Sequence, residues 1–592
     1  MNDYSVQLYN RDFSQILRPY SLEFTPERIS WSAIGGPSEA MIKATGPIIE
    51  LWEMIERLRC PIEVIAPNKT MIWWGFIESV TIQTKSISVS VSLDQMSNRV
   101  CVTYAEVNVA GAVGERKTTT WYENADSIAA YGTKERRLSK SQATQSEAEN
   151  YAQTQLDRLK YPITKHSFLN ADDHSEGNVI LTCAGWWKTL GWKYFEFSGG
   201  KESFEDIGIG LMALGKGLTS TTISFEAHVD SPKIKDTTEG LLDFSTNETI
   251  YVLGSVANNG TYTISSTRDL DAPAGCYLIV EESVVNGAAG PSVTIQGAVK
   301  CAQSFQISTI EGWLAASLRI RMKREGSPTD NVVVSLYSDS FGVGTLLASG
   351  SLPGTTISEN LNWVEISLNA MVFLDPATTY WIVVERDGAI DSKNYYKVDA
   401  NEDLSYTSGV MKIWNGAAWV DRVPDADMLF QVGGVEEATA QLERILVSGA
   451  QFFSAVDVDI DSGVYSSPYR DGDTTALQCV EDLLSSGTTN YRRILANVDF
   501  QRRVNLYEEP VSGSKDYYLY SDGSLHDWMG RKINKWDYPV GVWAKLADVI
   551  PASADTQKIS DPSKVFIEKI VFNIKEDEIY LQERDYVGLM EI

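Results

Sequence analysis

The spacing of apolar residues changes character twice along the chain. Residues 1–200 mix two periods: apolar side chains recur at helical spacing in "PIIELWEMIERLRCP" and at every second position in "ISVSVSL". From about 200 to 433 helical spacing nearly vanishes, and short apolar runs alternate with turns rich in Gly, Ser, Thr and Asn. Helical spacing returns after Gly434. The pattern predicts an α+β chain, mainly β, that inserted β-sandwich modules interrupt.

Four regions are expected from these changes, because 592 residues are too many for one hydrophobic core. Their predicted bounds are 1–200, with a helical part at about 118–162; 201–300, a small β module; 301–433, a β-sandwich; and 434–592, a second α+β region.

Proline and glycine mark the predicted ends of several elements. The first helix lies between Pro47 and Pro61. In the last region, "EEATAQLERILVSG" and "DTTALQCVEDLLSSG" predict helices that end at Gly449 and Gly487, with Asp473 as the N-cap of the second. The Asn-Gly pair in "NNGTY" predicts a hairpin turn between two strands, and "YRRILANVDFQRRVNLYEEP" predicts two strands joined by a tight turn.

The charge balance excludes several partners. The net charge is −28 and the isoelectric point is near 4.6, so the surface repels nucleic acid and anionic membranes. We expect no membrane span and no signal peptide, and therefore synthesis in a cytoplasm. The cysteines do not form C-x-x-C pairs and are predicted to be buried thiols. They are Cys60, Cys101, Cys183, Cys276, Cys301 and Cys479.

Candidate catalytic and DNA-binding groups are explained more simply by surface structure. Asp172 and Asp173 lie in the polar stretch "NADDHSEGN", which predicts a solvated turn and not an acid–base pair. The pairs Arg492–Arg493 and Arg502–Arg503 lie on predicted short strands, so their side chains alternate between faces and are expected in salt bridges. The four histidines are scattered and no metal-binding motif is present. We therefore expect no enzyme, no cofactor and no metal.

Three stretches together resemble the tail or baseplate hub proteins of tailed bacteriophages, in particular siphophages. They are "ISWSAIGGPSEAMIKATG" with the "MIWWGFIESV" that follows, "LTCAGWWKTLGWKYFEF", and "YRDGDTTALQCVEDLLSSGTTNYRRILANVDFQRRVNLYEEP". The resemblance covers the two outer regions. It implies two related hub-type β-barrels, one in 1–200 and one in 434–592, and a homotrimer that caps the tail tube.

The partners expected from this resemblance are a distal tail protein ring, a tail-tip or fibre protein, and two further copies of the chain. DNA is expected to pass through the channel without specific binding. The localisation implied is the virion tail tip, with synthesis in the host cytoplasm.

The middle regions resemble accessory modules of phage and bacterial surface proteins. Residues 301–433, with "TTYWIVVERDG" and "MKIWNGAAWV", are similar to jelly-roll carbohydrate-binding modules. Candidate rings for stacking on a sugar of a host-surface polysaccharide are Trp363, Tyr395, Trp414 and Trp419. Trp381, among alternating apolar residues, is instead predicted to be buried.

The stretch "AVDVDIDSGVY" carries Asp457, Asp459 and Asp461 at every second position. A calcium loop would need glycine at its sixth position and glutamate at its twelfth, where this chain has Ser462 and Pro468. A strand fits better, with Val and Ile toward a core. In a hub, its three aspartates are predicted to line the DNA channel.

A different functional class also remains open at this stage. The chain fits a secreted or surface carbohydrate-binding adhesin, or a polysaccharide-degrading enzyme with a carbohydrate-binding module. The expected absence of a signal peptide and of an acid pair favours the hub.

Overall fold

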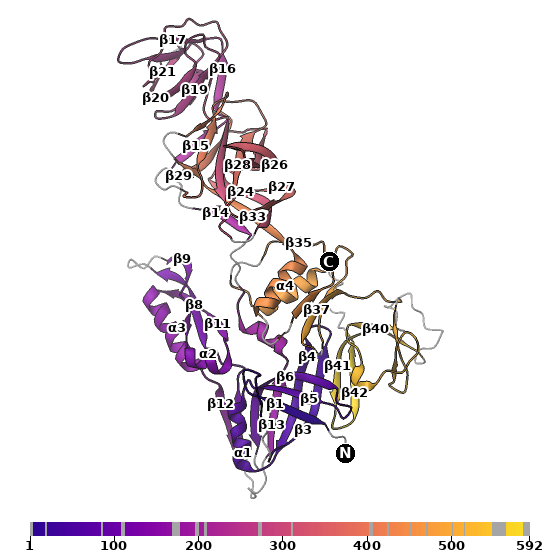
Figure 1. Cartoon of the computed structure of the whole chain (residues 1–592). Coiled ribbons are helices and arrows are strands. Elements are labelled where there is room, and N and C mark those ends of the chain that lie inside the picture. The colour runs from indigo at the N-terminus through magenta and orange to yellow at the C-terminus, as the bar shows by residue number, and fades with distance from the viewer. Residues whose placement is uncertain are drawn as a thin grey trace. The chain divides into compact units, whose positions relative to one another are not determined.

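The structure is a computed structural model (Figure 1), and its contacts divide the chain into two compact units. Unit 1 combines Met1–Phe197 with Glu437–Ile592, and unit 2 is Ser198–Glu436. The predicted fold class, α+β and mainly β, is confirmed. The residues described are 4–17, 21–83, 87–107, 113–168, 178–195, 200–205, 210–269, 275–309, 312–401, 406–422, 426–449, 453, 455–460, 462–468, 472–499, 501–513, 515–547 and 564–583.

A fourteen-stranded sheet forms the frame of unit 1 and joins its two chain segments. The junction is the antiparallel pair β3–β41, in which Ile29 lies opposite Phe572. In sheet order the strands are β2 (Ile16–Leu17), β1 (Ser5–Tyr9), β5 (Pro61–Ile65), β6 (Met71–Gln83), β13 (Asn178–Ala184), β4 (Gly36–Thr45), β3 (Glu23–Ser32), β41 (Lys564–Asn573), β40 (Val542–Leu546), β38 (Tyr517–Leu519) and β39 (Leu525–His526), with β7 (Ile87–Ser92), β12 (Ile163–Phe168) and β42 (Glu578–Glu583) beside this path.

The core of unit 1 is rich in aromatic side chains. Phe76 on β6 is fully buried, and its ring centroid lies 4.7 Å from that of Trp186 and 5.4 Å from that of Trp192. Both tryptophans belong to the 3-10 helix η2 (Trp186–Trp192). The predicted first helix is present as α1 (Ile48–Glu53), followed by the 3-10 helix η1 (Met54–Arg57).

The region predicted as helical over about 118–162 is only partly so. It contains α2 (Ala125–Tyr131) and α3 (Gln145–Leu159), but β11 (Glu135–Ala143) runs between them. β11 pairs in parallel with β8 (Arg99–Val107), a non-local contact that local spacing does not reveal. The same four-stranded sheet contains β9 (Val113–Thr118) and β10 (Tyr122–Glu123). α3 packs on β8 (Figure 1).

The C-terminal segment of unit 1 supplies two helices and a small sheet. Helix α4 (Ala438–Gly449) ends at the predicted glycine, and α5 (Ala476–Ser486) is capped by Gly487. The N-cap of α5 is Thr475 and not Asp473, because Thr475 and Gln478 form a reciprocal capping box. The small sheet is β34 (Ala455–Val458), β37 (Arg503–Glu508) and β36 (Ile494–Val498), of which the last two form the predicted antiparallel pair. Shorter elements are β35 (Tyr465–Ser466) and the 3-10 helix η5 (Lys535–Asp537).

Unit 2 begins and ends on neighbouring strands. Its first strand, β14 (Lys201–Phe204), pairs antiparallel with its last, β33 (Phe430–Glu437), and Lys201 lies opposite Gly433. The backbone N–H of Gly434 also donates to the carbonyl of Gly200 at 2.7 Å. The chain therefore enters and leaves unit 2 side by side, which is the geometry of a tolerated insertion.

The first part of unit 2 is a seven-stranded β module. Its core is formed by apolar side chains such as Ile250, Ile264 and Leu278. In sheet order the strands are β16 (Gly217–Ser220), β22 (Val293–Gln296), β19 (Thr249–Leu253), β20 (Gly260–Asp269), β21 (Cys276–Val280), β18 (Lys233–Asp236) and β17 (Ile223–Glu226), with the 3-10 helix η3 (Gly240–Asp243). The predicted hairpin is β19–β20, but Gly260 is the first residue of β20 and pairs with Val252, so the loop is longer than an Asn-Gly turn.

The rest of unit 2 is a sandwich of two sheets around a shared core. The β24 sheet contains, besides β14 and β33, β24 (Trp313–Glu325), β29 (Tyr395–Asn401), β15 (Gly210–Leu214), β27 (Asn362–Leu374) and β32 (Asp427–Met428). The β28 sheet is, in order, β26 (Val343–Pro353), β25 (Asn331–Asp339), β28 (Thr379–Arg386), β23 (Lys300–Gln306), β30 (Met411–Trp414) and β31 (Trp419–Asp421). The 3-10 helix η4 (Gly354–Thr356) follows β26.

All six cysteines are described, and each is a buried thiol outside any disulfide, as predicted. Within the described residues, no helix is long and apolar enough to cross a membrane.

Candidate functional site

The outer face of the β28 sheet gathers aromatic side chains from several strands. Along β23, Cys301 and Phe305 point into the sandwich core, so the alternating residue Ala302 points outward. The outward residues form a separate apolar cluster. Its members are Ala302, Trp381 and Val383, with Tyr337, Val343 and Trp419 packed against them.

The β30–β31 hairpin places Trp414 and Trp419 directly opposite each other. Their ring centroids are 5.6 Å apart, in an edge-to-face arrangement, and both side chains are partly exposed. The hairpin is held at its tip, because Gln296 of the seven-stranded module donates from Nε2 to the carbonyl of Asn415 at 3.2 Å. The two rings therefore form a fixed, partly open aromatic edge.

Trp381 is buried, as predicted, with 3% of its surface exposed. It lies, however, in the cluster on the outer face of the β28 sheet and not in the core between the sheets. Its indole Nε1–H donates to Asp339 Oδ1 at 2.7 Å, which satisfies the polar edge of the ring. Trp381 is thus a buried member of the cluster against which the partly exposed Trp419 packs.

Charged pairs border the same face. Lys300 forms an ion pair with Glu385, and Lys412 lies 3.2 Å from Asp421 across the hairpin. Lys300 is also in register with Trp414, so rings and hydrogen-bonding groups lie side by side. Aromatic faces beside polar groups are suited to a sugar, because its ring has apolar faces and a polar rim.

The other two predicted aromatics lie on the β24 sheet. Trp363 on β27 is half-buried, with the Arg319 guanidinium 6.0 Å from its ring centroid. Tyr395 on β29 is only 9% exposed, and burial raises its pKa to about 12. The ammonium of Lys216 lies 5.3 Å from its ring centroid. Tyr395 is therefore not available for stacking, and the structure brings together only Trp414 and Trp419 of the four.

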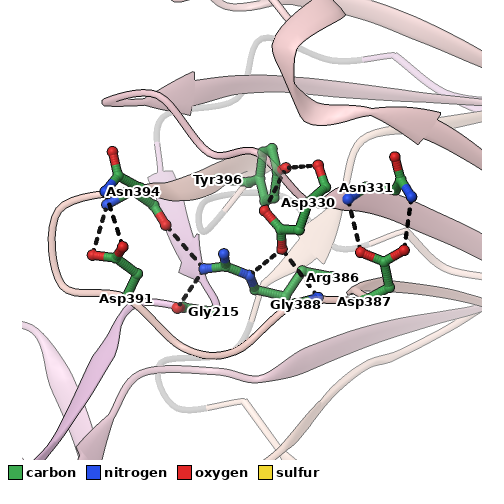
Figure 2. Close-up of polar contacts among 9 residues, drawn as sticks. All are labelled: Gly215, Asp330, Asn331, Arg386, Asp387, Gly388, Asp391, Asn394 and Tyr396. Atoms are coloured by element: carbon green, nitrogen blue, oxygen red, sulfur yellow. Dashed lines mark hydrogen bonds and ion pairs between the residues drawn. The ribbon is translucent and has the colours of Figure 1, made fainter.

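A polar network around Arg386, which is not apparent in the sequence pattern, connects several segments of unit 2 (Figure 2). Arg386 is 6% exposed and donates from Nε to Asp330 Oδ2 at 2.6 Å. Its Nη1 donates to the carbonyls of Gly215, at 3.1 Å, and Asn394, at 2.9 Å. Tyr396 donates its hydroxyl to the Asp330 carbonyl at 3.0 Å.

The acidic groups near Arg386 accept hydrogen bonds from two asparagine residues, Asn331 and Asn394. Asp387 accepts from the backbone N–H and the side chain of Asn331, both at 2.8 Å. Asp391 accepts from the Asn394 side chain at 2.9 Å. No group of three or more His, Cys, Asp or Glu side chains in the described part of the chain is placed to hold a metal ion. The network therefore acts as a structural joint between loops.

The aspartate strand is present, although shorter than expected. β34 ends at Val458, and Val456 and Val458 pack against the core of unit 1 as predicted. Asp457 lies opposite Asn505, 3.5 Å from Arg503 Nη1. Asp459 is exposed just beyond the strand, and Asp461 lies outside the described residues. A channel wall requires neighbouring subunits, so the channel-lining role of the three aspartates stays a prediction.

Replacing Asp457 with asparagine should change the free energy of unfolding by less than about 1 kcal/mol, because its ion pair with Arg503 is exposed to solvent. Asp499→Asn is the matched control. Asp499 Oδ1 accepts the backbone N–H groups of Gln501 and Arg503, and its Oδ2 accepts from Arg503 Nε at 3.0 Å. Asparagine keeps an oxygen for the backbone groups without its charge and places an amide donor against Arg503 Nε, so Asp499→Asn should lower the free energy of unfolding more than Asp457→Asn does. Urea denaturation measures both; a larger loss for Asp457→Asn would contradict this placement.

The arginine pairs form salt bridges, as expected. Arg492 lies 2.7 Å from Glu508, and Arg493 lies 3.0 Å from Glu568. Arg502 pairs with Glu63, and Arg503 lies 3.0 Å from Asp499. The predicted turn at Asp172 and Asp173 lies outside the described residues.

No family model matches the chain, and no curated protein matches it significantly. Among solved structures, a glycoside hydrolase family 43 arabinoxylan arabinofuranohydrolase from Bacillus subtilis is 11% identical over 61% of this chain, with a TM-score of 0.11. The chain spans 63% of the length of that enzyme chain.

Two further solved structures are similarly distant. The CBM22-1–CBM22-2 tandem domain of Paenibacillus barcinonensis Xyn10C is 9% identical over 70% of this chain and 93% of its own, with a TM-score of 0.12. A Cry1Da tryptic core variant from Bacillus thuringiensis is 6% identical over 55% and 51%, with a TM-score of 0.12. Scores this low identify no shared fold, so function is argued from the residues.

Proposed function

We propose that this chain is a structural subunit of a phage tail tip, a trimeric hub that caps the tail tube and encloses a channel for DNA. The observation that carries this proposal is the insertion of unit 2. Unit 1 is built from the N-terminal and C-terminal segments of the chain and contains the described residues of all three stretches that resemble hub proteins. The insertion enters and leaves on the paired strands β14 and β33, so it can decorate unit 1 without interrupting its sheet.

The role of unit 2 in this proposal is contact with the host. Its outer β28 face offers the rings of Trp414 and Trp419, which lie beside the Lys412–Asp421 pair. We infer that this face binds a host-surface polysaccharide. The Arg386 network would hold the surrounding loops in place during that contact, because its polar groups are satisfied within the protein.

Replacing Trp414 with alanine should weaken glycan binding about tenfold or more, because a ring that stacks on a ligand often contributes 2 kcal/mol or more, as an order of magnitude, to affinity. Trp363→Ala is the matched control: it removes the same side chain from the other sheet and should leave affinity unchanged. The full chain is screened on a glycan array, and the retained glycans are titrated by calorimetry. An equal loss of glycan affinity in both variants would argue against the β28 face as the binding surface.

The location of the subunit distinguishes the hub from the alternative class. Immunogold labelling of native particles should place the chain at the tail tip. Label on the surface of particle-free cells, or release of reducing sugar from a polysaccharide by the purified chain, would instead support the adhesin or the degrading enzyme.

A further inference from the structure

A cavity of about 460 Å³ lies within unit 1, and no residue of β34 lines it. Three parts of the chain line it: the β8–β11 sheet, the residues that follow η2, and the helices α4 and α5 with the loop between them. The volume is in the range of small-molecule sites, roughly 300–1,000 Å³. Nothing in the proposed hub role requires such a cavity.

One wall of the cavity is a cluster of two arginine side chains and two aromatic rings. The guanidinium carbon of Arg99 lies 5.0 Å from the Trp121 ring centroid. The guanidinium carbon of Arg137 lies beside two rings, 5.8 Å from the centroid of Trp121 and 5.4 Å from that of Tyr194, and the two ring centroids are themselves 6.1 Å apart. These contacts restrain both guanidinium groups, so their N–H edges are held in fixed directions before any ligand arrives.

The charge of the lining is opposite to that of the whole chain. Four cationic side chains and one carboxylate line the cavity within the described residues, whereas the net charge of the chain is −28. The carboxylate, Glu135, is 7% exposed and is held by Arg99 Nη1 at 2.5 Å and by the backbone N–H of Tyr194 at 2.7 Å. The cations are Arg99, Arg137, Lys193 and Arg444.

Two acids outside the cavity, one paired with Arg99 and one with Arg137, are solvent-exposed. Asp473 pairs with Arg137 and is 67% exposed; Glu123 lies 3.4 Å from Arg99 and is 56% exposed. Water screens such pairs strongly, so they cancel little of the field inside the cavity. Lys193 has no ion-pair partner among the described residues, so its ammonium is free to meet a ligand.

We infer that this cavity binds a small anionic sugar, that is, a sugar ring carrying one carboxylate or phosphate group. Lys193 and the restrained guanidinium groups would hold the anionic oxygens, while Trp121, Tyr194 and Phe195 supply apolar surface for the ring. A long polyanion such as duplex DNA is disfavoured, because the surrounding surface is acidic. The inference does not depend on the hub proposal.

Calorimetric titration of the full-length chain tests it, with glucuronate and glucose 6-phosphate as probes and glucose and inorganic phosphate as controls. Both probes should bind, and each control should bind at least about tenfold more weakly, because each lacks either the charge or the ring. Absence of binding by both probes at millimolar concentration would overturn the inference. Inorganic phosphate binding as tightly as glucose 6-phosphate would overturn the part that concerns the sugar.

Lys193→Gln should lower the affinity for each probe about tenfold, because the substitution removes a charge-assisted hydrogen bond to the anionic group. Lys160→Gln removes the same charge from an exposed pair with Asp157, outside the cavity, and should leave both affinities unchanged. Thermal unfolding of each variant checks that the fold is intact. Equal affinity of Lys193→Gln and the natural chain would place the probes elsewhere and contradict the assignment.

Discussion

Replacing Arg386 with methionine should lower the free energy of unfolding of unit 2 by about 3–5 kcal/mol, because removing one partner leaves a buried charge unpaired. Asp330, whose side chain is 11% exposed, would lose its cation. The carbonyls of Gly215 and Asn394 would also lose a donor in the same position. Methionine keeps the apolar part of the side chain, so the change isolates the charge.

The double variant Arg386→Met/Asp330→Asn is the control for this interpretation. It removes both charges, while the asparagine oxygen can still accept the Gly388 N–H that Asp330 Oδ2 now accepts at 3.2 Å. We expect it to recover at least about half of the loss. Urea denaturation followed by hydrogen exchange and mass spectrometry reports each unit separately. If Arg386→Met were as stable as the natural chain, the network would contribute nothing to the free energy of unfolding of unit 2.

Replacing Phe76 with alanine should destabilise unit 1 by about 3–5 kcal/mol and leave unit 2 unaffected. The ring is fully buried between β6 and η2, where Trp186 and Trp192 contact it, so its removal leaves a cavity in the core. The same exchange measurement should show faster exchange in residues 1–197 and 437–592 only.

Ile49→Ala is the matched control for the core substitution. Ile49 is 74% exposed on α1, so its truncation should cost less than about 0.5 kcal/mol. If Phe76→Ala instead destabilised both units equally, their cores would be coupled and the division into two units would be thermodynamically wrong.

Local pattern was sufficient wherever one element determines its own structure. The first helix that begins after Pro47, the capping glycine Gly487 and the alternation that turns Val456 and Val458 inward are all present in the structure. Each depends on residues a few positions apart, which is why a single sequence predicts them. The apolar stripe predicted for that helix is only partly buried, because Leu51 faces the core while Ile48 and Trp52 are each 42% exposed.

Features that depend on distant residues were missed or misplaced. β11 was included in a helical region because its pairing with β8 is non-local. Tyr395 was expected to stack on a ligand, but Lys216, far away in the sequence, covers its ring. Thr475 displaced Asp473 as the N-cap, although the T-x-x-Q spacing to Gln478 was legible in the sequence.

The candidate sites also differ in whether neighbouring or distant residues determine them. The hairpin aromatics Trp414 and Trp419 could be selected from the turn between them, because neighbouring positions determine their geometry. The Arg386 joint and the cationic cavity could not, since each is assembled from segments separated by long stretches of chain. A lone arginine at the end of an apolar strand gives no local signal of its partners.

The mass of the assembled protein tests the central claim most directly. Mass photometry of the full-length chain, released from native particles or purified at nanomolar to micromolar concentration, should show a species of three 65.6-kDa chains, because a hub requires a closed ring. Class averages of the same sample should show threefold rings. A monomer at every concentration, with no ring in the images, would contradict the account.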